Sequence, residues 1–114
     1  MKLNFSSNQK RYRAMCDLNK RHIGRAKKAG VTVDATPSQL IRIISKQKGR
    51  CCYCYCRVDE LTLEHITPIS MGGGHTVKNI AFACDKCNNR KGNRDPFDFK
   101  KSGFSAIFIL NFIK

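Results

Sequence analysis

Four of the seven cysteines form two pairs with the same spacing, Cys51 with Cys54 and Cys84 with Cys87. A Cys-x-x-Cys pair bends the backbone into a knuckle, and two such pairs can complete the tetrahedral thiolate shell that Zn²⁺ prefers. Because four protein ligands leave no open coordination position, a zinc ion held in this way would be structural. In so short a chain, metal binding would supply a large share of the folding free energy, on the order of 10 kcal/mol.

Three cysteines remain outside this scheme. Cys52 and Cys56 create an ambiguity of register, since Cys52 with Cys56, or Cys54 with Cys56, could also act as ligands. Only Cys51 with Cys54 repeats the spacing of the second pair, and this choice is therefore favoured. Cys16 is expected to be an ordinary core residue.

Side chains suited to acid–base and metal chemistry lie between and just after the two pairs. Glu64 and His65 end an apolar segment, Asn79 precedes another, and Asn88 follows the last paired cysteine. A histidine titrates near neutrality and can take a proton from water at physiological pH. A carboxylate and an amide oxygen suit a hard divalent ion and leave most of its shell to water and phosphate. A base for water and a site for a divalent ion are among the groups that phosphodiester hydrolysis requires.

The segment from "CCYC" through "LTLEHITPISMGGGHTVKNIAFACDKCNNRKGN" resembles the HNH endonucleases, over about residues 36–99. The preceding "TPSQLIRIISKQKGRC" resembles the helix that leads into this motif in small phage and bacterial members. The resemblance implies an α+β chain with a ββα-metal (His-Me finger) core and a structural four-cysteine zinc site, preceded by basic helices. It implies a metal-dependent endonuclease that nicks or cuts double-stranded DNA.

The same resemblance assigns roles to individual residues. His65 would be the general base, Glu64 and Asn88 would hold the catalytic divalent ion, and Asn79 would pin the intervening loop and orient the hairpin. Asn88 stands where the eponymous third histidine occurs, which favours an oxygen-bound ion, Mg²⁺ or Mn²⁺.

Two helices are expected before the first cysteine pair. Residues 10–29 place apolar side chains at helical spacing and carry cations around the remaining circumference, and Gly30 ends this helix. Its apolar stripe is Tyr12, Met15, Cys16, Asn19, Ile23 and Ala26. A second helix over about residues 37–48 begins with a capping box of Thr36 and Gln39, with Pro37 at its first position. Its buried face is Leu40, Ile41, Ile43 and Ile44, and Gly49 ends it.

The elements that must position the polar residues come later in the chain. Apolar and β-branched runs over residues 61–70 and 79–84 predict two short strands, separated by a glycine-rich loop with no regular structure. After Cys84 a short helix is expected, with Asp85 as its cap and Gly92 at its end.

The charge distribution indicates a polyanionic partner. The formal net charge is +14, and residues 1–50 carry 13 of the 22 Lys and Arg side chains but 2 of the 8 Asp and Glu. We expect double-stranded DNA to contact Lys10, Arg11, Arg13, Lys20, Arg21, Arg25, Lys27, Lys28 and Lys91. Lys91 could equally be a solvated lysine. His22 is expected on the polar face of its helix, and His75 as a solvated loop residue that could alternatively touch DNA or carry a proton.

The expected organisation has three parts. Residues 1–35 form a basic helical DNA-binding extension, residues 36–103 the nuclease domain, and residues 104–114 an apolar segment that packs on the core or on a partner, such as a second copy. That run is too short to cross a bilayer, and the start of the chain lacks the apolar core of a signal peptide. We therefore expect no membrane partner and a cytoplasmic location, in a bacterial or phage-infected cell. The alternative functions are a zinc-stabilised DNA-binding module without turnover and a redox or metal-storage protein.

Overall fold

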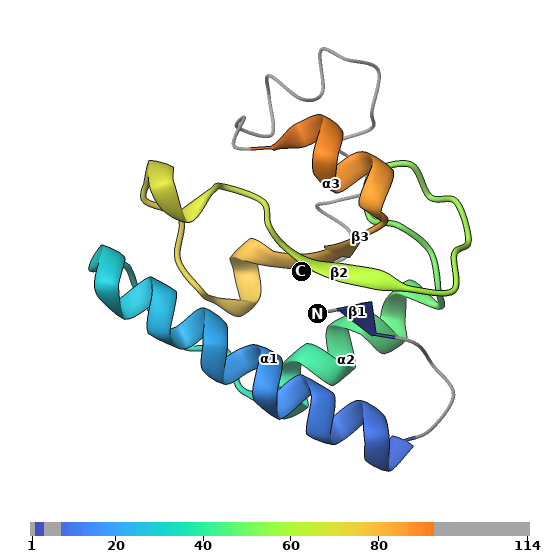
Figure 1. Cartoon of the computed structure of the whole chain (residues 1–114), viewed down its shortest axis with the longest axis horizontal. Helices are drawn as coiled ribbons and strands as arrows, with labels where there is room; N and C mark the ends of the chain where they lie inside the picture. Colours follow the sequence, from blue (N-terminus) through green and yellow to red (C-terminus); the bar gives the residue numbers. More distant parts are fainter. Residues whose placement is uncertain (1, 4–7, 93–114) are drawn as a thin grey trace.

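The computed structural model describes residues 2–3 and 8–92. The elements follow the order β1 (Lys2–Leu3), α1 (Asn8–Ala29), α2 (Pro37–Gln47), β2 (Leu61–His65), the 3-10 turns η1 (Ile69–Met71) and η2 (Val77–Asn79), β3 (Ile80–Ala83) and α3 (Asp85–Lys91). Figure 1 shows α1 and α2 on one side of the β2–β3 hairpin and α3 on the other.

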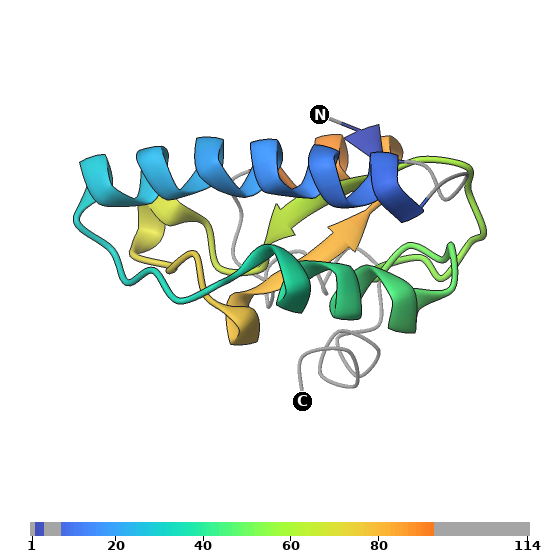
Figure 2. The ribbon, with the colours of Figure 1, turned by 90° about the horizontal axis from the view of Figure 1, so that it is seen from below.

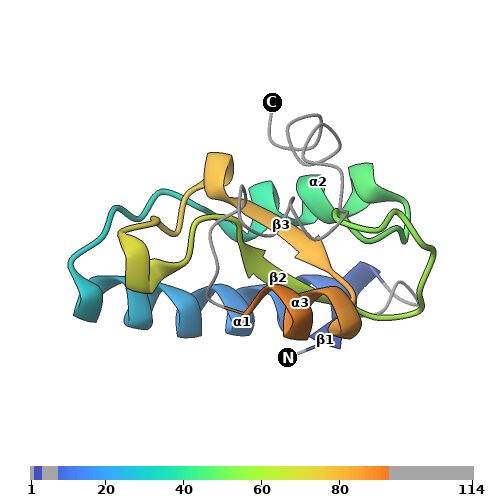
Figure 3. The same ribbon diagram turned by 90° about the horizontal axis from the view of Figure 1, so that it is seen from above.

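The strands form one antiparallel sheet in the order β1-β2-β3. In the hairpin, Glu64 lies opposite Ala81 and His65 opposite Ile80, so the polar pair stands at the end of β2 where the connecting loop begins. β2, β3 and α3 make a ββα unit. Figures 2 and 3 show α1 and α2 side by side; the two helices pack against each other, and α2 also packs against β3. The α+β class expected from the sequence is confirmed.

Helix α1 forms where the periodicity predicts it, but its buried face differs from the predicted stripe. Met15, Leu18 and Ala26 are fully buried, whereas Tyr12 is 46% exposed. The prediction omitted Leu18 and was wrong for Tyr12, because the stripe runs through positions 15, 18 and 26 and turns Tyr12 outward. Met15 and Leu18 belong to the same hydrophobic core as the hairpin, so α1 packs as part of this core.

Helix α2 carries the expected capping box. Thr36 Oγ1 accepts a hydrogen bond from the Gln39 main-chain N–H, and the Gln39 side chain accepts from the Thr36 N–H. At the other end, Gln47 pairs with β3: its Oε1 accepts from the Phe82 N–H (2.9 Å) and its Nε2 donates to the Phe82 oxygen (2.7 Å). The Gln47 side chain therefore satisfies the Phe82 main-chain N–H and oxygen at the outer edge of β3, as the backbone of a neighbouring strand would.

Helix α3 begins one residue earlier than predicted. Cys84, with extended backbone angles, is the N-cap, and its side chain makes no capping hydrogen bond. The expected cap, Asp85, lies in the first turn, where its carboxylate still favours the positive end of the helix, and it accepts a hydrogen bond from Thr62 Oγ1 (3.2 Å). Gly92 ends the helix as predicted, with φ of 55° and its N–H donating to the Asn88 oxygen.

The apolar segment 104–114 and the end of the expected nuclease domain lie outside the described residues, so the predictions about them stay predictions. Within residues 2–3 and 8–92, no helix has both the length and the apolar character needed to cross a membrane.

Candidate active site and metal centre

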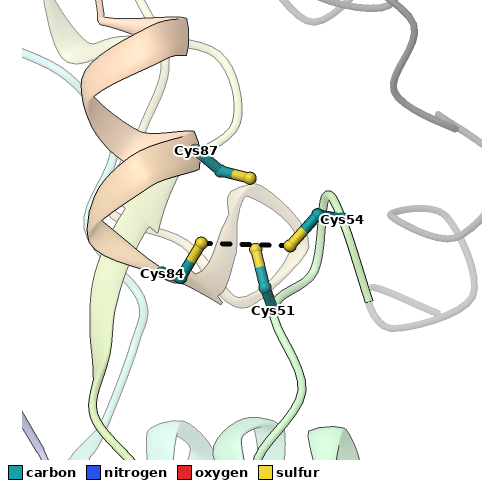
Figure 4. Close-up of side chains that lie close together, drawn as sticks. All are labelled: Cys51, Cys54, Cys84 and Cys87. Carbon is teal, nitrogen blue, oxygen red and sulfur yellow. Dashed lines mark hydrogen bonds between the residues drawn. The ribbon is translucent and has the colours of Figure 1, made fainter. Parts of the chain in front are cut away.

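The four paired cysteines converge on one point. Their sulfur atoms all lie within 4.8 Å of one another, and those of Cys54 and Cys84 are 3.9 Å apart (Figure 4). Zn–S bonds of about 2.3 Å in a tetrahedron require sulfur atoms roughly 3.8 Å apart, so the cluster fits such an ion. Cys51 joins this cluster with Cys54, as the spacing favoured, whereas Cys52 is buried in the hydrophobic core and Cys56 is exposed. The four cysteines are thus placed to hold a metal ion such as zinc.

Backbone hydrogen bonds shape the first knuckle. The Cys51 N–H donates to the Cys56 oxygen and the Tyr55 N–H to the Cys51 oxygen, both at 3.0 Å. Tyr55 takes a left-handed conformation (φ 63°) to close this turn. The Tyr53 N–H points at Cys51 Sγ (3.3 Å), which favours the thiolate form that binds metal. A bond from the Cys52 N–H to the Phe82 oxygen (3.0 Å) fixes the knuckle to β3.

A pocket of about 530 Å³ brings together three of the predicted catalytic residues. Glu64 and His65 from β2 and Asn88 from α3 line it. Arg21 and Arg25, one turn apart on α1, line it as well, together with His22. Oxygen ligands, an imidazole and two guanidinium groups therefore face one cavity, and such a set suits a phosphate-containing ligand and a hard cation.

The Glu64 carboxyl group is buried beside Lys91. The Lys91 ammonium lies 3.7 Å from Glu64 Oε2 and donates to the His65 main-chain oxygen at 3.3 Å. Burial raises the pKa of Glu64 to about 7, against the opposing effect of the Lys91 charge. Among the described residues, Glu64 Oε2 makes this ion pair but no hydrogen bond, which leaves it lone pairs for a cation. The Lys91 side chain is buried. It is therefore neither a solvated lysine nor placed on the surface to contact a DNA phosphate, as the sequence had suggested.

Two histidines that the sequence analysis set aside lie beside His65. His75 is completely buried, and its Nδ1 is 3.0 Å from His65 Nε2. The prediction of a solvated His75 was therefore wrong. His22 is not simply on the polar face: its ring centroid is 5.2 Å from that of His65 and 5.7 Å from that of His75.

The environment of these rings keeps them neutral. Burial is the main cause that lowers the pKa of His65 to about 3 and of His22 to about 4, and it lowers the pKa of His75 as well. The neighbouring rings and the Arg25 charge add to the effect at His65. At neutral pH the His65 imidazole is therefore unprotonated on one nitrogen, and its low pKa makes it a weak base.

Asn79 closes the loop between the strands. Its Oδ1 accepts from the Thr67 N–H (2.8 Å), and its Nδ2 donates to the oxygens of Thr67 (3.0 Å) and Gly74 (2.8 Å). Gly73 allows this closure, because a Cβ there would lie 1.9 Å from the Thr67 oxygen. These contacts are the loop pinning that was expected of Asn79, while its part in catalysis stays a prediction.

The basic side chains of α1 are largely turned to solvent. Arg11 is half-buried and donates to Ser45 Oγ of α2 (3.4 Å). The other predicted DNA contacts on this helix are exposed: Lys10, Arg13, Lys20, Arg21, Arg25, Lys27 and Lys28.

A family model described as HNH endonuclease matches residues 51–103. Over residues 51–103 the chain is similar to the HNH endonucleases. No curated protein matches the chain. The matched segment contains both cysteine pairs, the hairpin and α3, with Glu64, His65, Asn79 and Asn88. It supports a nuclease-type function in general. Helices α1 and α2 precede the match, although α1 contributes Arg21, His22 and Arg25 to the pocket that the matched segment lines.

Proposed function

We propose that this chain is a metal-dependent endonuclease that hydrolyses phosphodiester bonds of double-stranded DNA. The observation that carries the proposal is the single pocket lined by Glu64, His65 and Asn88, with Arg21 and Arg25 at its side. Hydrolysis needs a base for the attacking water and positive charge near the phosphate, and this pocket has side chains for both.

The roles of the chain's own residues follow from their chemistry. The neutral His65 imidazole accepts a proton from the water that attacks phosphorus. Glu64 and Asn88 are the ligands for Mg²⁺ or Mn²⁺, which would stabilise negative charge that develops on the phosphate and the leaving oxygen. Arg21 and Arg25 bind phosphate oxygens and orient the backbone of the DNA.

The two metal sites have separate tasks in this proposal. The four-cysteine site holds Zn²⁺ as a structural ion, because all its ligands come from the protein. Cys84 and Cys87 are at the start of α3, so the zinc ion fixes the helix that carries Asn88. The exposed cations of α1 supply affinity for DNA through phosphate contacts that do not depend on sequence.

Relaxation of supercoiled plasmid by the zinc-loaded protein tests the function. We expect cleavage with Mg²⁺ or Mn²⁺ and a loss of about 10²- to 10⁴-fold in rate for His65→Ala. Lys78→Ala is a matched control, because Lys78 is exposed and does not line the pocket. Cleavage that persists in His65→Ala would remove the assignment of the base. DNA binding without cleavage in either metal would instead favour the zinc-stabilised binding module.

A further inference from the structure

A chain of hydrogen bonds connects α1 to the His65 ring. Asn19 Nδ2 donates to the Ala35 main-chain oxygen (3.1 Å), and Asn19 Oδ1 contacts His75 Nε2. His75 Nδ1 in turn contacts His65 Nε2 at 3.0 Å. Asn19 is buried and His75 has no exposed surface, so the protein itself must satisfy these polar atoms.

The direction of each hydrogen bond can be derived from one fixed end. A main-chain carbonyl oxygen only accepts, so the Asn19 atom that faces Ala35 must be its nitrogen, and the amide oxygen faces His75. His75 Nε2 must then carry a hydrogen. A neutral imidazole has a single N–H, so His75 Nδ1 is an acceptor and His65 Nε2 is the donor.

The surroundings of His75 leave it little freedom to change this arrangement. Its main-chain N–H donates to the Thr32 oxygen (2.8 Å), and its main-chain oxygen accepts from the N–H groups of Asp34 and Ala35 (3.1 and 3.3 Å). The ring of His22 stacks on the His75 ring, with 12° between the two planes. Burial also lowers the pKa of His75, which keeps the ring neutral as the chain of hydrogen bonds requires.

We propose that Asn19 and His75 are positioning residues that hold His65 in the tautomer with hydrogen on Nε2, which leaves Nδ1 as its basic atom. The inference rests on the proposed role of His65 as the general base. A His65 ring with hydrogen on Nδ1 would have its lone pair on Nε2, turned toward His75 and unable to take a proton from water in the pocket. Helix α1 is thus part of the catalytic apparatus as well as a carrier of positive charge.

Nitrogen-15 NMR of the zinc-loaded full chain at pH 7.5, without DNA, reads the tautomer of each histidine directly. We expect wild-type His65 and His75 both to carry hydrogen on Nε2. Asn19→Leu and His75→Leu should each remove the preference for one tautomer at His65. His75→Asn places an amide oxygen near the former Nδ1 position and should preserve it. Asn89→Leu is the matched control, since Asn89 is exposed on α3 and lies outside the chain of hydrogen bonds.

Cleavage kinetics complete the test. In Asn19→Leu and His75→Leu we expect kcat to fall about 10- to 100-fold with KM nearly unchanged, because neither change removes a charge that attracts DNA. His75→Asn should recover most of the loss. Zinc content and thermal unfolding identify any variant that has not folded. If a leucine variant does not fold, the His65 tautomer and the kcat of His75→Asn still test the inference.

Two results would overturn the inference. One is a wild-type His65 that carries its hydrogen on Nδ1. The other is a folded Asn19→Leu variant with wild-type tautomer and kcat. Wild-type protein that has the expected tautomer but cuts no DNA in Mg²⁺ or Mn²⁺ would overturn the proposed function instead, and would leave the tautomer assignment supported.

Discussion

The buried ammonium of Lys91 lies 3.7 Å from Glu64 Oε2, and it also donates to the main-chain oxygen of His65. One cation from α3 therefore contacts both neighbouring residues at the end of β2. Its position makes Lys91 part of the support of the pocket rather than of a surface for DNA.

Lys91→Met should destabilise the protein by about 3 kcal/mol at pH 8, because it leaves a buried carboxylate without its partner. The loss should be smaller at pH 6, where protonation of Glu64, whose pKa is about 7, removes the charge. Urea unfolding of the zinc-loaded protein at the two pH values measures this. Lys86→Met, an exposed position on the same helix, should change stability by at most about 0.5 kcal/mol. Equal effects of the two substitutions would contradict the buried pair.

The affinity for Mn²⁺ should fall as the pH drops below 7. Burial raises the pKa of Glu64 from 4.5 to about 7, and a metal ion binds only the deprotonated carboxylate. Below the pKa, each unit of pH should weaken binding about tenfold, with a plateau above it. Titrations followed by electron paramagnetic resonance from pH 6 to 8 provide the measurement. Glu64→Gln should bind weakly at every pH; an affinity of the wild type that is flat over this range would argue against Glu64 as a ligand.

Cys84→Ser should lose zinc and unfold readily, whereas Cys56→Ser should retain one zinc ion per chain and nearly full stability. The reason is that Cys84 is one of the four converging cysteines and Cys56 is exposed outside them. Elemental analysis and thermal unfolding compare the pair.

Asn88→Ala should keep its zinc and lose cleavage, since Asn88 lines the pocket next to a cysteine of the metal centre. Zinc loss in Asn88→Ala would contradict the separation of the two sites.

Neutral substitutions on α1 should separate DNA affinity from catalysis. Lys27→Gln with Lys28→Gln removes two exposed charges and should reduce the slope of log affinity against log salt by roughly 0.9 for each phosphate that is no longer neutralised. Arg25→Gln, at the pocket, should in addition lower kcat. Binding and cleavage measured from about 50 to 200 mM salt distinguish the two cases. Equal kcat values for both variants would place Arg25 outside the reaction.

The sequence was sufficient for the three helices, the start of the hairpin strands and the cysteine cluster, because these depend on local rules. It did not indicate β1 or the two 3-10 turns, and the strand expected over residues 61–70 ends at His65. Repeated spacing selected the four cysteines that the structure brings together, in spite of Cys52 and Cys56, and the capping box of Thr36 and Gln39 located α2. The family resemblance supplied Glu64, His65 and Asn88, and the structure brings these three to one pocket.

Contacts between distant segments could not be derived in the same way. The partners of His75 come from β2 and from α1, 10 and 56 residues away along the chain, and no local pattern connects them. One signal was available: Asn19 falls on the apolar stripe of its helix, and an amide at a core position requires a buried partner. The environment of Lys91 had no comparable signal, because it depends on how α3 docks against β2.

Helix α1 is synthesised well before β2, β3 and His75, which share its hydrophobic core and the hydrogen bond of Asn19. Met15 and Leu18 lack the part of their core that β2 and β3 supply until both strands have been made. Asn19 lacks its contact with His75 until translation has passed that residue. Incomplete translation products therefore contain a cationic helix without the pocket that Glu64, His65 and Asn88 line in the folded chain.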